Sequence, residues 1–402
     1  MPDIIRSILD TDLYKFTMGY GAFLLFPNLE VEYRFVNRGK TKFLAIFAEE
    51  LQKQISAMAD LKLSPREIEF LRTQGLFSEK YLSWLSNYQF DPSEVTITQE
   101  GEALNIKIKG LWKRAIFWEV PLMALISELY YLETGRAAQE GWIEKARQKG
   151  LRLKQLMALF MEFATRRRFS FGVQDRVLQE LIETAGLESN GGVLMGTSNV
   201  FLAMKYGIPV LGTVAHEWIM VFAALYGYLG ANTRALEAWN KIFGDKLAIA
   251  LTDTFTTDVF LKEFGPFAEK YRGVRQDSGD PLEIMDKVIA FYIREGFDPG
   301  EKIFLASDGL NITMVERILI HAAGRIQCRF GIGTYLGNDV GSEEIKIDPL
   351  NMVIKLFGIF LEDGSFKPVV KLSDSKGKIT GDQQEAIRAI RELGLVRFYG
   401  LA

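Results

Sequence analysis

Apolar and polar positions in the N-terminal region repeat with two different periods. Apolar side chains first recur at helical spacing, in a stripe made of Leu13, Phe16, Tyr20, Phe23 and Leu24. Residues 31–35 (VEYRF) then alternate, as a half-buried strand does, and residues 95–110 have the pattern of a hairpin that turns near Gly101. Residues 64–67 (SPRE) form a helix-capping box. The pattern predicts helices mixed with antiparallel strands over residues 1–115.

Residues 116–339 have a different pattern. A helix is expected from Pro121 through Tyr131, and a further helical stretch to about Ala164. Six short apolar runs follow, most of them leading into polar residues and a helical pattern: GVLMG, IPVLG, LAIAL, GVR, IFLAS and CRFGIG. Repeated strand–helix units predict an α/β fold with a parallel sheet. Polar or charged residues that could bind or react with a substrate follow almost every run. This favours a barrel, because a barrel gathers the loops after all its strands at one end.

The last part of the chain returns to antiparallel strand patterns. They cover residues 352–360 (MVIKLFGIF) and 367–372 (KPVVKL), and we expect them to pack on the N-terminal region. At about 150 residues per domain, 402 residues allow two or three domains. The predicted organisation is one domain from residues 1–115 and 340–402, and an α/β-barrel domain from residues 116–339.

Composition narrows the chemistry. Lys and Arg number 48 and Asp and Glu 51, so the net charge of −3 argues against a nucleic-acid partner. Cys328 is the single cysteine, and His216 and His321 are the two histidines, so we predict no metal site built from these residues and no disulfides. The first residues lack a basic start followed by a long apolar run, so we expect no signal peptide, and the longest apolar stretch, residues 218–229, is too short to cross a bilayer. A cytoplasmic protein without a membrane partner is expected.

The two histidines have different contexts. His216 directly follows an apolar strand pattern and is adjacent to Glu217, which suits a reactive group at the end of a barrel strand. A lone histidine is more often structural, and Glu217 could either orient the imidazole or point away from it. His321 lies in the last turn of a predicted helix, where a histidine usually complements the helix dipole or is exposed.

Several charged clusters suit an anionic substrate. Residues 166–168 (RRR) are either a solvated helix end or an anion clamp, with the Phe163 ring on nearly the same helical face. Asp280 is most simply the cap of the helix that follows it, whereas Arg275 and Asp277 are free to bind the phosphate and hydroxyl groups of a phosphorylated sugar.

Glycines complete this predicted sugar-phosphate site. Gly331 and Gly333 stand at the end of the last apolar run, and residues 307–309 (SDG) stand one strand–helix unit earlier. Backbone N–H groups in such turns can approach a phosphate closely, although a glycine-rich turn alone is weak evidence.

Eight motifs occur in an order that resembles the nicotinate phosphoribosyltransferase family. They are DTDLYKFTM, EFATRRRFSFG, GTSNVFLA, GTVAHEW, LTDTF, GVRQDSGDP, ASDGLN and FGIGT. The resemblance extends from Asp10 to about Lys378. It implies the fold of a type II phosphoribosyltransferase: an incomplete (β/α) barrel and a smaller mixed α+β domain built from both termini. It also implies that nicotinate and phosphoribosyl pyrophosphate are joined to nicotinate mononucleotide and pyrophosphate in NAD salvage, coupled to ATP hydrolysis.

The resemblance implies a site for the pyridine ring. Tyr14 would stack on the ring from the partner subunit of a head-to-tail homodimer, with Phe163 on the other face and Arg166 on the carboxylate. Ser198 stands where related nicotinamide-using enzymes carry an aspartate, and a serine there removes a negative charge that would repel a carboxylate. Ala164 departs from the family pattern, which usually has glycine at this position.

The resemblance also implies roles for the charged residues. ATP would phosphorylate His216, and Mg²⁺ would arrive on the pyrophosphate. The ribose and pyrophosphate would be lined by Asp253, Arg275 and Asp277. The ribose 5-phosphate end would be lined by Asp308, Gly309, Gly331 and Gly333.

Three alternatives stay open on the sequence. A nicotinamide phosphoribosyltransferase is disfavoured by Ser198, and a quinolinate phosphoribosyltransferase would be shorter and lack the histidine motif. A non-catalytic nucleotide-sensing relative would be expected to have lost His216 or one of the aspartates.

Overall fold

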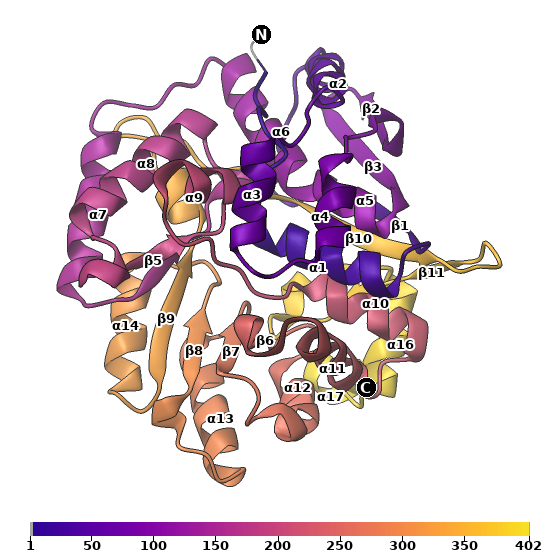
Figure 1. Ribbon diagram of the computed structural model, residues 1–402, viewed down its shortest axis with the longest axis vertical. Helices are drawn as coiled ribbons and strands as arrows, with labels where there is room; N and C mark the ends of the chain where they lie inside the picture. The colour runs from indigo at the N-terminus through magenta and orange to yellow at the C-terminus, as the bar shows by residue number, and fades with distance from the viewer. Residues whose placement is uncertain (1–2, 402) are drawn as a thin grey trace.

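The antiparallel sheet beside the barrel combines strands from both ends of the chain. The computed structural model describes residues 3–401, and its five-stranded sheet has the order β11-β10-β1-β3-β2 (Figure 1). The strands are β1 (Glu30–Asn37), β2 (Val95–Glu100), β3 (Ala103–Leu111), β10 (Met352–Phe360) and β11 (Phe366–Pro368). β10 pairs antiparallel with β1, from Glu30 opposite Phe360 to Asn37 opposite Met352. The predicted α+β domain built from both termini is confirmed.

Six parallel strands form the incomplete barrel. Their order is β5-β4-β9-β8-β7-β6. They are β4 (Phe160–Glu162), β5 (Leu194–Thr197), β6 (Ile249–Leu251), β7 (Gly273–Gln276), β8 (Ile303–Ala306) and β9 (Gln327–Ile332). Within residues 3–401 no strand pairing joins β5 to β6, so the barrel is open there. Because neighbouring strands are parallel, their carboxyl ends meet at one edge.

Helices surround both sheets. Those before the barrel are α1 (Leu13–Leu25), α2 (Phe47–Met58), α3 (Pro65–Thr73), α4 (Glu79–Ser86), α5 (Trp112–Ala115) and α6 (Glu119–Glu133). The barrel region has α7 (Trp142–Gln155), α8 (Phe171–Thr184), α9 (Val200–Tyr206), α10 (His216–Tyr226), α11 (Ala231–Phe243), α12 (Thr257–Phe264), α13 (Pro281–Arg294), α14 (Ile312–Ala322) and α15 (Thr334–Gly337). The predicted caps at Ser64 and Asp280 accept backbone hydrogen bonds, and so does Asn311 at the start of α14.

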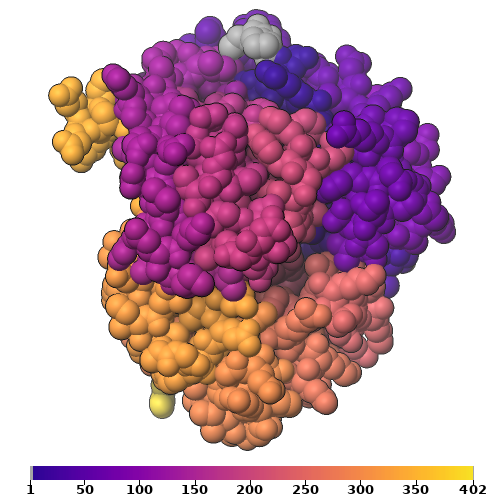
Figure 2. All heavy atoms as spheres, turned by 60° about the vertical axis from the view of Figure 1, so that its left-hand side comes forward, coloured from indigo at the N-terminus to yellow at the C-terminus, as the bar shows by residue number. Residues whose placement is uncertain are grey.

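The C-terminal segment returns to the edge of the barrel where the parallel strands end. It contains β12 (Val370–Lys371), β13 (Thr380–Gly381), α16 (Gln383–Glu392) and α17 (Val396–Tyr399). Leu372 donates a backbone hydrogen bond to Thr254 in the loop after β6. In the space-filling view, indigo N-terminal segments pack directly against magenta and orange segments of the barrel region (Figure 2).

Two element predictions in the barrel were wrong. The helical stretch expected to reach about Ala164 ends with α7 at Gln155, and the buried residues of β4 follow. A fully buried strand of three residues has no alternation that distinguishes it from a helix. The IPVLG run, residues 208–212, forms only an isolated bridge between Val210 and Thr197.

The expectation about apolar stretches also needs correction. Within residues 3–401, the helical stretch Trp112–Glu133 is long and apolar enough to cross a membrane, and it is longer than residues 218–229. In the structure, 89% of its most apolar window is buried inside the protein. A helix that is apolar on all sides is typical of a protein core as well as of a membrane span, so its burial accounts for its composition.

Candidate active site

The candidate site lies at the carboxyl edge of the parallel strands. Six of the predicted site residues stand directly after a parallel strand or in the loop that follows it. They are Phe163 after β4, Ser198 after β5, Asp253 after β6, Asp277 after β7, Asp308 after β8 and Gly333 after β9. The edge contains a small cavity of about 60 Å³ and an adjoining one of about 470 Å³. His216, Phe163, Arg166, Arg275 and Asp277 line both.

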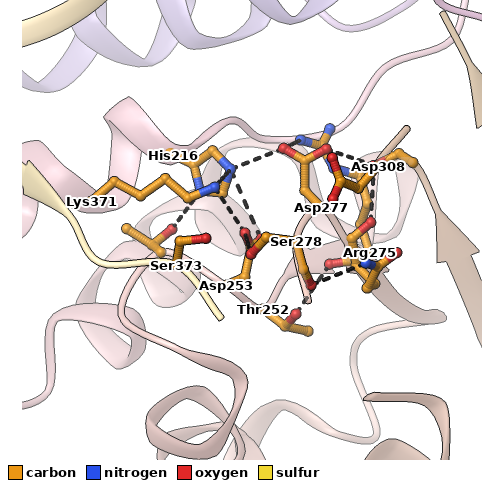
Figure 3. A network of polar contacts seen from close by, with 12 residues as sticks. His216, Thr252, Asp253, Arg275, Asp277, Ser278, Asp308, Lys371 and Ser373 are labelled. Atoms are coloured by element: carbon orange, nitrogen blue, oxygen red, sulfur yellow. Dashed lines mark hydrogen bonds and ion pairs between the residues drawn. The ribbon is translucent and has the colours of Figure 1, made fainter. Parts of the chain in front are cut away.

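His216 is the first residue of α10 and is held from three sides. Its Nδ1 lies 3.0 Å from Thr254 Oγ1, and its Nε2 lies 3.0 Å from Asp277 Oδ2 and 2.8 Å from Lys371 Nζ. Asp253 joins the group, because its Oδ2 accepts a hydrogen bond from Lys371 Nζ at 2.8 Å. The side chains of Asp253, Asp277 and Lys371 surround the imidazole and come from separate segments of the chain (Figure 3).

The surroundings set the charge states of this group. Burial, and then the positive charge of Lys371, lower the pKa of His216 to about 4, so the imidazole is neutral near pH 7. Burial opposes ionisation of Asp277, but Arg275, His216 and Lys371 outweigh it and hold the pKa of this carboxyl well below its usual value. For Asp253, Lys371 and His216 likewise outweigh burial and lower the pKa. The site therefore combines a neutral imidazole with two ionised carboxylates.

Glu217 points away from the imidazole. Its carboxylate accepts hydrogen bonds from Lys15 Nζ at 3.0 Å, Tyr33 Oη at 3.1 Å and Trp112 Nε1 at 3.3 Å. Lys15 is also paired with Glu119. Glu217 therefore does not orient the imidazole. Its carboxylate connects α10 to α1, β1 and α5 instead.

The three arginines of residues 166–168 have three different environments. They lie in and after a 3₁₀ turn that follows β4, so neither a helix end nor a helical face shared with Phe163 exists. Arg168 is buried and donates two hydrogen bonds to Asp10, at 2.6 and 2.7 Å. Arg167 lines the larger cavity, and burial and the charges of Arg166 and Arg38 lower its pKa to about 10. Arg166 lines both cavities, its Nε 3.9 Å from Asp12 Oδ2.

The electrostatic argument from Ser198 needs a correction. Ser198 Oγ donates a hydrogen bond to Asp12 Oδ1 at 2.7 Å, and both residues line the small cavity. A carboxylate is therefore present beside the serine. Burial raises the pKa of Asp12, although Arg166 and Ser198 oppose the shift. Ser198 alone does not make this end of the cavity free of negative charge.

Two aromatic rings, Tyr14 and Phe163, line the small cavity. The Tyr14 that lines it belongs to the same chain, so the structure supplies this ring without a second subunit, whereas the resemblance assigns it to the partner. The homodimer itself stays a prediction. Lys355 also lines both cavities, and burial lowers its pKa to about 8.

Gly331 in β9, and Gly333 and Gly337 after it, make room for neighbouring groups. A Cβ at Gly331 would lie 2.6 Å from the Phe163 ring, and one at Gly333 would lie 2.7 Å from the Phe163 carbonyl oxygen. A Cβ at Gly337 would lie 2.4 Å from the Cβ of Ala164. The absence of a side chain at Gly337 therefore leaves room for the methyl group of Ala164. Gly331 and Gly333 also line the larger cavity, where the sugar-phosphate end was predicted.

The larger cavity has cationic and anionic walls. Asp308 accepts hydrogen bonds from Lys378 Nζ at 2.7 and 2.6 Å, and Ser307 Oγ donates to Asp277 Oδ1 at 2.9 Å. Arg38 and Arg167 line the same cavity. This cavity therefore brings together the residues predicted for the ribose 5-phosphate end, which are Asp308, Gly309, Gly331 and Gly333. Arg275 lines it as well and donates a hydrogen bond to Thr213 Oγ1 at 2.5 Å.

Sequence reasoning missed the residues that come from outside the barrel strands. Lys371 and Lys378 belong to the KPVVKLSDSKGK segment, Lys355 to β10, and Asp12 precedes α1. The family resemblance extends through this segment to about Lys378, so the lysines of the segment are the signal that could have identified it as part of the site. His321 lies apart from the site, its Nε2 3.0 Å from Asp286 Oδ2 on α13.

Among residues 3–401, no group of three or more His, Cys, Asp and Glu side chains is placed to hold a metal ion. The carboxylate of Asp253 is instead paired with Lys371. The carboxylate of Asp277 is paired with Arg275 and His216. A cation at this edge would therefore need ligands from a bound molecule as well.

Comparisons with known proteins agree with this architecture. Residues 158–394 match the sequence model of the nicotinate phosphoribosyltransferase (NAPRTase) family, and residues 9–127 match that of its N-terminal domain. The chain is 45% identical to the nicotinate phosphoribosyltransferase of Chromohalobacter salexigens over 98% of this chain and 100% of that one. The enzyme of the same name from Methanosarcina mazei is 42% identical, over 96% and 97%. The crystal structure of nicotinate phosphoribosyltransferase from Porphyromonas gingivalis superimposes with a TM-score of 0.93 at 42% identity, over 97% of this chain and 100% of that one.

Proposed function

Because this chain belongs to the nicotinate phosphoribosyltransferase family, we propose that it joins nicotinate to phosphoribosyl pyrophosphate, with His216 phosphorylated by ATP. The products would be nicotinate mononucleotide and pyrophosphate. One observation carries the proposal: a neutral, buried histidine stands where a small aromatic cavity adjoins a larger one with cationic walls. This arrangement suits an aromatic acid on one side and a phosphorylated sugar on the other.

The small cavity supplies what nicotinate needs. Tyr14 and Phe163 offer two aromatic surfaces, and Arg166 can bind the carboxylate through charge-assisted hydrogen bonds. The pyridine nitrogen brings its own lone pair, so the bond to ribose C1 can form without a general base as the bond to pyrophosphate breaks. Holding the ring in line with that bond lowers the barrier through orientation.

The larger cavity supplies charge for the polyanionic partner. Arg38, Arg167 and Arg275 line this cavity, so their positive charges can bind the phosphate groups of the sugar substrate. Asp277 and Asp308 line this cavity and offer acceptors for ribose hydroxyls, whereas Asp253 is buried behind Lys371. Mg²⁺ carried by the pyrophosphate would supply a Lewis acid for the leaving group, and Asp277 and Asp308 are carboxylates of this cavity that could help to hold it.

His216 suits phosphoryl transfer because of its place and charge state. It begins an eleven-residue helix, where the partial positive charge of the helix N-terminus stabilises an added phosphoryl group. Its lowered pKa leaves a lone pair on the ring at neutral pH. A phosphoryl group there would lie beside both cavities, where it could order arginines and tighten substrate binding.

The lowered pKa of His216 gives an expected pH profile. An ordinary histidine, with a pKa near 6.5, would lose its nucleophilic form as the pH falls below about 7. With a pKa of about 4, His216 stays neutral to about pH 5, so phosphoenzyme formation from ATP should be nearly constant from pH 5.5 to 8. Rapid-quench measurement of acid-labile phosphate on the protein checks this. A fall with a midpoint between pH 6 and 7 would contradict the assignment.

The function is tested by incubating the chain with nicotinate, phosphoribosyl pyrophosphate and Mg²⁺, with and without ATP. Nicotinate mononucleotide should form in both cases and faster with ATP. Parallel reactions with nicotinamide and quinolinate test the alternative substrates. A clear preference for nicotinamide would replace the proposed substrate, and no product with any base would refute the proposal.

A further inference from the structure

The feature that the proposed mechanism leaves unused is the side chain of Lys371. It lies on β12 in the C-terminal segment and is buried, with only 8% of the residue exposed. Its Nζ is 2.8 Å from His216 Nε2 and 2.8 Å from Asp253 Oδ2. Figure 3 shows the extended side chain reaching the imidazole from the side opposite Asp277.

This contact constrains where the imidazole proton lies. A lysine ammonium only donates hydrogen bonds, so Nε2 must accept and carry the lone pair. The single proton of the neutral ring is then on Nδ1, which can donate to Thr254 Oγ1 at 3.0 Å. Asp277 Oδ2, 3.0 Å from the same Nε2, only accepts and favours the opposite tautomer, with the proton on Nε2. Lys371 and Asp277 therefore compete for one nitrogen.

The competition decides whether Nε2 can act as a nucleophile. Nε2 is the nitrogen that faces the charged groups of the site, whereas Nδ1 is engaged by Thr254. Asp277 has other partners, Arg275 at 3.4 Å and Ser307 at 2.9 Å, so it does not need the imidazole proton. Lys371 can likewise leave Nε2 without losing its pairing, because Asp253 remains bound to it.

We propose that Lys371 is a positioning residue that holds His216 in the tautomer with a lone pair on Nε2 and then pairs with the phosphoryl group placed on that nitrogen. The inference rests on the proposed function, in which ATP phosphorylates His216. The Nε2 lone pair forms the bond to the γ-phosphorus, and the electron pair of the broken P–O bond leaves with ADP. The ring keeps its proton on Nδ1, so no proton transfer is needed. Lys371 Nζ moves from Nε2 to a phosphoryl oxygen and remains the local counter-ion.

The tautomer can be measured without any substitution. The chain has only two histidines, so ¹⁵N-histidine labelling of the full protein gives signals from two imidazole rings. His321, on the surface beside Asp286, serves as the internal reference. The expected spectrum has His216 protonated on Nδ1 and unprotonated on Nε2. A spectrum with the His216 proton on Nε2 overturns the inference, whether or not any variant folds.

Variants test the consequence for phosphorylation. Lys371→Met removes the charge and the donors at similar length, and the proton should move to Nε2, where Asp277 accepts it. Phosphoenzyme formation from ATP should then fall by about 100-fold, since the wrong histidine tautomer has effects of this size or larger. Lys371→Arg keeps the positive charge and the hydrogen-bond donors, so its rate of phosphoenzyme formation should be about tenfold higher than that of Lys371→Met. Lys376→Met is the matched control on the same segment, because this exposed lysine lies over the Phe398 ring and does not contact His216.

The outcomes separate the two proposals. Slow phosphorylation in Lys371→Met together with a normal rate in Lys376→Met supports the role of Lys371. Phosphorylation at the wild-type rate in Lys371→Met, with an unchanged tautomer, overturns it and leaves the proposed function intact. If the wild-type protein itself forms no phosphohistidine, the ATP coupling fails, and with it the counter-ion role of Lys371.

Discussion

His216→Ala should abolish the stimulation by ATP and leave a slow, ATP-independent transfer. Alanine removes the only atom of the site proposed to carry a phosphoryl group, while Arg166, Arg275 and the two aromatic rings that position the substrates remain. A phosphoryl group can create one to three charge-assisted hydrogen bonds, each about 1.5–3 kcal/mol. Losing two of them corresponds to a decrease in kcat/KM of about 100-fold or more in the presence of ATP. Initial rates of nicotinate mononucleotide formation with and without ATP measure this effect.

His321→Ala is the matched control for this prediction. It removes the other histidine, which is bound to Asp286 away from the site, and should leave both the ATP stimulation and the phosphohistidine yield unchanged. Normal ATP stimulation in His216→Ala would show that the phosphate acceptor has been wrongly identified. The ATP-independent rate reports whether the variant has kept its fold and its substrate cavities.

Arg166→Ala should raise the KM for nicotinate far more than that for phosphoribosyl pyrophosphate. Arg166 lines the small cavity with Tyr14 and Phe163, and a charged hydrogen-bonding partner for a carboxylate contributes about 1.5–3 kcal/mol. The expected increase in the KM for nicotinate is therefore about 10- to 150-fold. Steady-state kinetics with each substrate varied in turn give both constants.

The neighbouring arginine provides the contrast. Arg167 donates to the Met352 carbonyl oxygen at 3.1 Å and lines only the larger cavity, so Arg167→Ala should mainly raise the KM for phosphoribosyl pyrophosphate. An equal rise of both constants in Arg166→Ala would refute the carboxylate-binding role. A selective rise for the sugar substrate would assign Arg166 to the phosphate instead.

The parts of the fold that the sequence predicted are those specified by short-range patterns. The alternation of residues 31–35, the hairpin at Gly101 and the cap at Ser64 depend on neighbours a few positions apart, and all three are present in the structure. β4 was missed because three fully buried residues have no periodicity, and tertiary contacts with β5 and β9 on either side make it a strand. The same error placed Phe163 and Arg166 on a helix that does not exist.

The sequence alone predicts that Asp253, Asp277 and Asp308 follow barrel strands and therefore share one edge. It also places His216 at that edge, although the run before it forms only an isolated bridge. The partner of each charged group, in contrast, depends on tertiary packing. Arg168 is paired with Asp10, Glu217 with Lys15 and His216 with Lys371, across 158, 202 and 155 positions of the chain. Periodicity and capping act within a few residues, whereas a buried charge takes whichever opposite charge or donor the packed core places within about 3 Å. That pairing turns Glu217 away from the histidine and brings a distant lysine to it.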